Sequence, residues 1–169
     1  MKKPHMERKL YIIRHGKSSW DNEGLDDFDR PLAERGIRSA NEMAHRLNDK
    51  GLVPELIFSS PASRALNTAL IMSRIWGLEA GDLQIHDPIY MAYVSELEQV
   101  VASASSQVGN LAIVGHNPAF TLYANQFLKE PMENLPTAGV VIITLESEGW
   151  DRIGRAHVRE TYVDYPKRK

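Results

Sequence analysis

The sequence predicts an α/β fold built as three layers (α/β/α), with helices on both faces of a mostly parallel central sheet. Two observations predict this class. Short apolar runs of strand length alternate along the chain with longer segments of helical periodicity, an order typical of parallel sheets covered on both sides. In addition, two of the apolar runs end in polar clusters that contain a histidine, as expected where buried parallel strands reach the carboxyl edge of a sheet.

Three strands and two helices are expected in the first half of the chain. In order, the elements are a strand at 9–13, a long polar loop at 16–31, a helix at 34–50, a strand at 55–58, a helix at 62–76 and a short, weak strand at 83–86. The first helix is supported by Ile37, Ala40 and Ala44, which recur at helical spacing, and Gly51 ends it. A loop of such length is usually functional or disordered.

The second half of the chain is expected to continue this alternation. Its elements are, in order, a helix at 95–105, a strand at 111–114, a helix at 118–128, a strand at 139–145 and a last strand near 152–158 at the edge of the sheet. Ser95 followed by Glu98 has the spacing of a capping box, and Pro118 suits the first position of a helix.

Length and composition indicate a single domain over residues 1–169, with 1–8 and 166–169 frayed. A formal net charge of −2 gives no reason to expect binding to nucleic acid or to membranes. The absence of cysteine excludes disulfides, thiolate metal sites and a cysteine nucleophile. No apolar run approaches the ~20 residues of a membrane span and no signal peptide is visible, so we predict a cytoplasmic location.

Arg14, His15 and Gly16 follow the first strand and are suited to phosphoryl transfer. A histidine can attack phosphorus when one ring nitrogen is unprotonated. Arginine holds phosphate oxygens through a planar fork at any working pH, and glycine lets the backbone approach a ligand closely. Taken alone, the tripeptide is a weak signal, because it occurs by chance in many proteins.

Two further strand ends carry basic residues. Arg64 lies in the first turn of the helix after the second strand, where free N–H groups and the helix dipole favour an anion. His116 follows the strand at 111–114. Taken singly, Arg64 fits a surface arginine and His116 fits a buried, hydrogen-bonded histidine. Together with Arg14 and His15, the two residues predict one basic pocket at the edge of the sheet.

With these residues in place, the sequence resembles the histidine phosphatase superfamily, which has the phosphoglycerate mutase-like fold, and within it the short SixA-type phosphohistidine phosphatases. The matching stretches are Leu10–Ser18, Arg30–Gly36, Ser59–Ala69 and Val114–Pro118. The resemblance implies that His15 is the nucleophile, which becomes a phosphohistidine. It also implies that Arg14 and Arg64 hold the phosphoryl oxygens. His116 would then stabilise charge in the transition state, without a metal or any other cofactor.

Lys17, Ser18 and Asn117 are the further residues that we expect to bind the substrate. Ser18 and Asn117 are near enough to contact phosphate, although either also suits a local backbone cap. Lys17 stands where mutase-type members carry an acidic or amide residue, and it either adds charge to the pocket or is solvated at its rim. No pair of the remaining histidines has the spacing of metal ligands, so no metal is assigned.

The stretch Asp87–Tyr93 lacks a carboxylate where mutase-type members carry the acid that protonates the leaving group. A phosphoramidate leaves as an amine or imidazole that is already basic, so it needs a dedicated acid less than an alcohol does. The absence therefore favours hydrolysis of phosphohistidine in a phosphorylated protein. The alternatives are a phosphatase or mutase acting on a small phosphate-bearing substrate, and a catalytically silent module that binds phosphate or a partner.

Overall fold

The computed structural model describes residues 6–167 of the chain, and these fold around one six-stranded sheet. The strands are β1 (Met6–Arg14), β2 (Leu56–Ser59), β3 (Leu83–Ile85), β4 (Asn110–Gly115), β5 (Val140–Ser147) and β6 (His157–Asp164). The α-helices are α1 (Glu34–Asp49), α2 (Ser63–Ile75), α3 (Val94–Ala102) and α4 (Ala119–Asn125). Short 3-10 helices are η1 (Asp27–Asp29), η2 (Ala80–Asp82), η3 (Asp87–Ile89) and η4 (Trp150–Arg155). Within these residues, no helix combines the length and the apolar character that crossing a membrane requires.

The sheet is mostly parallel, as predicted. Its strand order is β3-β2-β4-β1-β5-β6. The first four strands in this order run parallel, whereas β5 is antiparallel to β1 and β6 is antiparallel to β5. Because β2, β4 and β1 are direct neighbours, their carboxyl ends lie side by side at one edge of the sheet.

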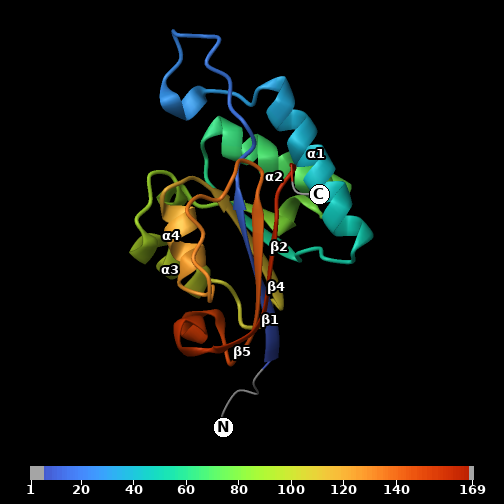
Figure 1. Cartoon of the computed structure of the whole chain (residues 1–169), viewed down its shortest axis with the longest axis vertical. Helices are drawn as coiled ribbons and strands as arrows, with labels where there is room; N and C mark the ends of the chain where they lie inside the picture. The colour runs from blue at the N-terminus through green and yellow to red at the C-terminus, as the bar shows by residue number, and fades with distance from the viewer. Residues whose placement is uncertain (1–5, 168–169) are drawn as a thin grey trace.

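Helices cover both faces of the sheet, which confirms the three-layer prediction. In Figure 1, α1 and α2 lie on one side of the strands, and α3 and α4 lie on the other. Strand β1 supplies both cores through its alternating side chains. Leu10 and Ile12 belong to the core under α3 and α4, and Tyr11 and Ile13 belong to the core under α1 and α2. A strand buried on both faces is a continuous apolar run in sequence, which is why β1 was readily predicted.

The last strand differs from the prediction near 152–158. Residues 150–155 form η4, and β6 begins only at His157. The side chains of Trp150 and Ile153 are both buried in the core, and their spacing of three residues matches one turn of a 3-10 helix. The predicted edge position is confirmed, because β6 pairs only with β5.

Helices α3 and α4 are shorter than predicted. The predicted capping box at Ser95 and Glu98 is wrong, because the Glu96 carboxylate accepts a hydrogen bond of 3.0 Å from the Tyr93 N–H and α3 begins at Val94. Helix α4 ends at Asn125 and does not reach residue 128. The Asn125 side chain there exchanges two hydrogen bonds, each 2.9 Å long, with the backbone of Met132 and so anchors the following turn.

The predicted fraying of residues 1–8 is wrong for Met6–Arg8, which belong to β1. The Arg8 side chain is buried and donates hydrogen bonds to the backbone oxygens of Ser147, Val108 and Glu148, which fix the start of the strand. At the other end, the Pro166 oxygen accepts a hydrogen bond from Arg46. Residues 1–5 and 168–169 of the predicted frayed ends lie outside the described residues.

Two glycines let the loop after β1 pack directly on the start of α1. A Cβ atom added at Gly16 would lie 2.7 Å from the Gly36 oxygen, and one added at Gly36 would overlap the Lys17 oxygen. Both neighbours are backbone atoms that no side-chain rotation can move away. The close approach fixes the path of the chain immediately after His15.

Substitution Gly36→Ala is therefore expected to destabilise the fold and to displace the loop after His15. Forcing a methyl group into a packed backbone contact typically costs about 1–3 kcal/mol of unfolding free energy. Urea unfolding measures this loss. The matched control is Gly81→Ala, because a Cβ atom at Gly81 meets no atom within 4 Å. Equal stability of the two variants would contradict the predicted contact.

Candidate active site

Three neighbouring strand ends deliver polar side chains to one place at the carboxyl edge of the sheet. His15 follows β1, Ser60 follows β2 and His116 follows β4. The backbone joins these ends, because the His15 N–H donates to the Gly115 oxygen at 3.0 Å and the Ser60 N–H donates to the Val114 oxygen at 2.9 Å. The imidazole centroids of His15 and His116 are 5.2 Å apart. The sequence prediction that both histidines share one site agrees with this geometry.

The imidazole of His15 is oriented with one nitrogen available for attack. Its Nδ1 lies 2.7 Å from the Gly16 carbonyl oxygen. A carbonyl oxygen only accepts hydrogen bonds, so Nδ1 of the neutral ring carries the proton and Nε2 keeps its lone pair. Within residues 6–167, no hydrogen bond engages Nε2. The Gly16 N–H is itself held by Thr68 Oγ1 at 3.0 Å, which ties this backbone to α2.

Three arginine side chains with buried polar atoms surround the histidines. Arg14 Nη1 donates to the Leu135 oxygen at 2.9 Å, and Arg30 Nη2 donates to Ser18 Oγ at 2.8 Å. Arg64 donates twice to Asp27, to its backbone oxygen at 2.7 Å and to its carboxylate at 3.0 Å. The remaining buried donors without a hydrogen-bond partner are Arg14 Nε, Arg30 Nε and Nη1, and Arg64 Nε. Buried donors normally have partners, so this cluster is suited to an anion with several oxygens.

His116 is held by Ser60. Its Nε2 lies 2.8 Å from Ser60 Oγ, while its Nδ1 is buried and has no hydrogen-bond partner. Ser60 Oγ also accepts the N–H of Ala62 at 3.2 Å, so its own hydrogen is free to point at the imidazole. When Ser60 donates to Nε2, the neutral ring carries its proton on Nδ1, where it can be donated to an anion.

Burial and neighbouring cations keep both histidines neutral. Burial lowers the pKa of His15 to about 4, and the charges of Arg64, Arg14 and Arg30 act in the same direction, against the hydrogen bond to Gly16. Burial likewise lowers the pKa of His116 to about 3, with smaller contributions from His15, Arg64 and Arg14, against the opposing charge of Asp27. An anion in the site would offset the cationic charge, so its binding favours protonation of these rings.

Asp27 and Tyr90 close the site from two separate loops. The Asp27 carboxylate accepts a hydrogen bond from the Tyr90 hydroxyl at 2.8 Å and lies 3.5 Å from Arg30 Nε. Burial alone would raise the pKa of Asp27, but the hydrogen bonds from Tyr90 and Arg64 and the arginine charges lower it. The ring of Tyr90 meets His116 edge-on at 5.6 Å. Asp27 is thus an ionised carboxylate that orients Arg64.

The structure places the three predicted substrate-binding residues differently. Lys17 has an exposed side chain, so it lies at the rim of the site. Ser18 is buried in the site, where its oxygen accepts from Arg30. Asn117 is a correction: both its amide hydrogens bond Asn134 and Leu135, and its oxygen accepts twice from Thr121. No side-chain donor of Asn117 remains for a phosphate.

Sequence reasoning missed Ser60, Asp27 and Tyr90 as site residues and used Arg30 only as part of a matching stretch. Ser60 had a usable signal, because it follows a strand end like the two histidines. Asp27 is one of several acidic residues in a long polar loop, and Tyr90 lies beyond the end of an edge strand, so nothing in their local pattern marks them. Their contact joins segments 63 residues apart.

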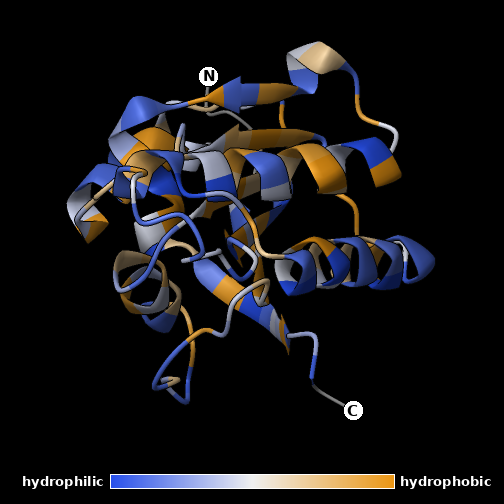
Figure 2. Cartoon of the chain, turned by 90° about the horizontal axis from the view of Figure 1, so that it is seen from above, coloured by the Kyte–Doolittle hydropathy of each residue, from blue (hydrophilic) through white to orange (hydrophobic). Residues whose placement is uncertain are grey.

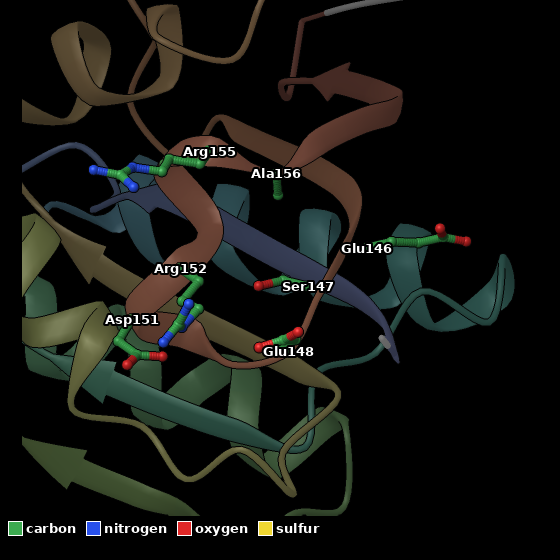
Figure 3. Close-up of a pocket in the computed structure, with 8 residues that line it drawn as sticks. Glu146, Ser147, Glu148, Asp151, Arg152, Arg155 and Ala156 are labelled. Carbon is green, nitrogen blue, oxygen red and sulfur yellow. The ribbon is translucent and has the colours of Figure 1, made fainter. Parts of the chain in front are cut away.

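A cavity of about 620 Å³ lies away from the two histidines. Figure 3 shows the side chains that line it. It is lined by residues between Glu146 and Ala156, and Ser147 in its wall pairs with Met6 at the start of β1. A nine-residue strand spans roughly 30 Å, which separates this cavity from His15. Acidic and basic side chains both line it.

Among residues 6–167, no group of three or more His, Asp or Glu side chains is placed to hold a metal ion.

The lowered histidine pKa values predict that anion binding takes up protons. Sulfate does not titrate near neutral pH, so any proton exchanged on its binding belongs to the protein. At pH 6 both rings are neutral in the free protein, and a bound dianion favours their protonated forms. Calorimetry in buffers of different ionisation enthalpy is expected to show net proton uptake, and binding without proton exchange would contradict the prediction.

The lowered pKa values of His15 and His116 also determine whether the free energy of unfolding rises or falls with pH. The two rings have pKa values near 6.5 in the unfolded chain and far lower values in the folded protein. Between about pH 4 and 6.5 the unfolded chain binds more protons, so the free energy of unfolding falls as the pH is lowered through this window. Thermal unfolding between pH 7 and 4.5 measures this fall in stability. A melting temperature that rises as the pH is lowered would contradict the prediction.

The chain is similar to known proteins over much of its length. Residues 10–86 match the family model described as the histidine phosphatase superfamily (branch 1). An uncharacterized protein of Picosynechococcus sp. is 31% identical over 119 residues, which are 65% of this chain and 67% of that protein. A 2,3-bisphosphoglycerate-dependent phosphoglycerate mutase of Bifidobacterium longum is 33% identical over 93 residues. This match covers 52% of the chain but only 38% of the mutase.

Among solved structures, the chain is similar to a protein of Agrobacterium tumefaciens assigned as the phosphohistidine phosphatase SixA. The two are 27% identical, with a TM-score of 0.74. The superposition covers 92% of this chain and 97% of the other. The likeness therefore extends well beyond the residues that the family model matches.

Proposed function

This chain belongs to the histidine phosphatase superfamily, and we propose that it is a phosphatase that works through a phosphohistidine at His15 and acts on phosphohistidine in proteins. The observation that carries the proposal is the cluster of buried, unpartnered donors around a neutral histidine. Arg14, Arg30, Arg64 and His116 all present such donors beside His15. A bound phosphoryl group satisfies these donors with its oxygens.

In the first step, Nε2 of His15 attacks the phosphorus of the substrate. The substrate imidazole carries a proton on its other nitrogen, so when the bond between phosphorus and the substrate nitrogen breaks, the electron pair of that bond stays on the nitrogen and a neutral imidazole leaves. Arg14 and Arg64 hold the oxygens while negative charge shifts among them. His116 donates a hydrogen bond from Nδ1–H to one of these oxygens and keeps its proton. In the second step, water attacks the phosphorus of phospho-His15, and the bond between phosphorus and Nε2 breaks with its electron pair returning to Nε2. Phosphate leaves, and the proton that the water loses passes to solvent.

The choice of phosphohistidine rests on the leaving group. The carboxylate next to the arginines, Asp27, has a lowered pKa and is held by Arg64 and Tyr90, so it is a poor proton donor. An alkoxide leaving group requires a proton from a strong general acid, whereas an imidazole is already basic. A site without a protonated acid therefore favours phosphoramidates over alkyl phosphates.

The decisive experiment compares kcat/KM for a protein that carries phosphohistidine with values for a panel of phosphate monoesters, including phosphoserine and an alkyl phosphate. We expect the phosphohistidine protein to be hydrolysed at least about 10-fold more efficiently, with activity unchanged by EDTA. A preference for monoesters would overturn the choice of substrate. Phosphate binding without turnover of any substrate would favour a silent binding module.

A small-molecule phosphatase or mutase is the second candidate, and the similarity to a phosphoglycerate mutase is the observation that favours it. A mutase moves a phosphoryl group within or between small molecules and releases little phosphate. The protein is incubated with phosphoglycerates, the isomers are separated and free phosphate is assayed. This experiment distinguishes a mutase from a phosphatase. Isomer exchange without phosphate release would favour the mutase.

A further inference from the structure

Two loops that flank the site carry exposed apolar side chains. We define the mouth loops as residues 17–29, which follow His15, and residues 90–93, which follow η3. Their exposed apolar side chains, with the exposed fraction of each, are Trp20 (69%), Leu25 (38%), Phe28 (38%), Met91 (78%) and Tyr93 (78%). Apolar side chains gathered around one opening are typical of a surface that binds another molecule.

The two mouth loops lie against each other beside the histidines. The ring of Phe28 meets the ring of Tyr90 edge-on at 5.1 Å, and Tyr90 in turn meets His116. Arg30 packs its guanidinium over the Trp20 ring, with Cζ 3.4 Å from the ring centroid. Figure 2 looks down on this end of the molecule, where loops drawn as tubes lie in front of the sheet. Through Phe28, Tyr90 and His116 the mouth loops are therefore in contact with each other and with the site.

The backbone of Met91 adds a separate observation. Its φ angle is 57°, in the left-handed region that a residue with a side chain rarely adopts. Such a conformation costs free energy, and in native proteins it is concentrated at functional sites. Here it presents a flexible apolar side chain to solvent, one residue beyond Tyr90.

The first mouth loop is also acidic. Asp21, Glu23, Asp26 and Asp29 all have exposed side chains, and within residues 6–167 none of the four forms an ion pair or a side-chain hydrogen bond. Lys17 is the exposed cation of the same loop. Four carboxylates near the entrance repel small polyanions and attract cationic groups within about a Debye length of 8–10 Å. This charge is unexpected beside an anion site unless the phosphoryl group arrives on a larger carrier.

We propose that the mouth loops are a docking surface for a phosphorylated protein whose phosphohistidine is flanked by apolar and basic side chains. The proposal rests on the proposed function and names the kind of partner. Whatever delivers a phosphoryl group to His15 must cover the entrance. Apolar side chains of the partner then bury Met91 and its neighbours, and its cations face the carboxylates. The carriers that this surface disfavours are free phosphorylated metabolites, which are small, polar and anionic.

The test uses two synthetic phosphohistidine peptides and phosphoramidate as a small substrate. One peptide carries Leu and Arg beside the phosphohistidine, and the other carries Ser and Glu. We expect kcat/KM to be at least about 10-fold higher for the first peptide, with the preference shrinking at high salt. Two variants, Met91→Gln and the double variant Asp26→Asn/Asp29→Asn, are expected to reduce the preference several-fold and to leave phosphoramidate hydrolysis within about twofold.

Matched controls are Leu70→Gln on the exposed face of α2 and Asp49→Asn at the end of α1, and both are expected to keep the preference. Equal kcat/KM for the two peptides would overturn the docking surface while leaving the proposed function standing. An equal loss of peptide and phosphoramidate hydrolysis in the variants would also overturn it, because the loops would then act on the chemistry itself. Failure to hydrolyse either peptide, with monoesters hydrolysed, would overturn the proposed function.

Discussion

Substitution His15→Ala is expected to lower turnover by about 10⁴-fold or more, the largest effect of any single change, because it removes the attacking atom. No other described imidazole can replace it. The ring of His116 shares the site, but its Nε2 is occupied by Ser60 and its pKa is lower still. Initial rates on phosphoramidate measure the loss, and mass spectrometry of the acid-labile phosphoenzyme identifies the phosphorylated residue.

The matched control is His45→Ala, which removes an exposed histidine from α1. It is expected to leave both activity and phosphoenzyme unchanged. The His15→Ala protein should remain folded, because the structural bonds at this position come from the backbone, through His15 N to Gly115 and His15 O to Ala138. A His15→Ala protein with more than a tenth of the original activity would contradict the assignment of the nucleophile.

Substitution His116→Ala is expected to lower kcat by about 10²–10³-fold, with a smaller change in KM. Removing one preorganised donor from developing charge has this magnitude in other enzymes. The imidazole is neutral in the free protein, so in the ground state it holds the anion less strongly than the arginines do. The hydrogen bond from His116 strengthens as negative charge accumulates on the phosphoryl oxygens in the transition state. Removing it is therefore expected to lower kcat more than it changes KM.

Ser60→Ala tests how His116 is oriented. Ser60 touches no substrate in this scheme and acts only through its 2.8 Å contact with His116. Losing such a hydrogen bond costs about 0.5–1.5 kcal/mol, which corresponds to a several-fold loss of kcat. Adding Ser60→Ala to His116→Ala is expected to cause no further loss. Additive effects in the double variant would contradict the predicted coupling, as would an unchanged kcat for His116→Ala.

The strands and the basic residues at their ends were predictable from local sequence. Strands β1 and β4 are apolar runs because both their faces are buried, and each ends where the polar residues begin. The strand predicted over the region of η4 is wrong because two apolar residues three positions apart are too short a pattern to distinguish a 3-10 helix from a strand. The family resemblance added roles for His15, Arg14, Arg64 and His116 that no spacing alone supplies.

The sequence by itself determined the layered fold and the cluster of Arg14, His15, Arg64 and His116, because neighbouring parallel strands bring their carboxyl ends together. Only the tertiary structure decided how each side chain is used. Asn117 was expected to bind phosphate, but Thr121, Asn134 and Leu135 occupy its amide.

The structure likewise brought in Asp27 and Tyr90. Their hydrogen bond spans 63 residues and exists only because two loops close over the same site. Local patterns record which face of an element is buried, whereas contacts between loops depend on the whole path of the chain. That is the physical reason why the positions of the basic residues followed from the sequence and the partners that orient them did not.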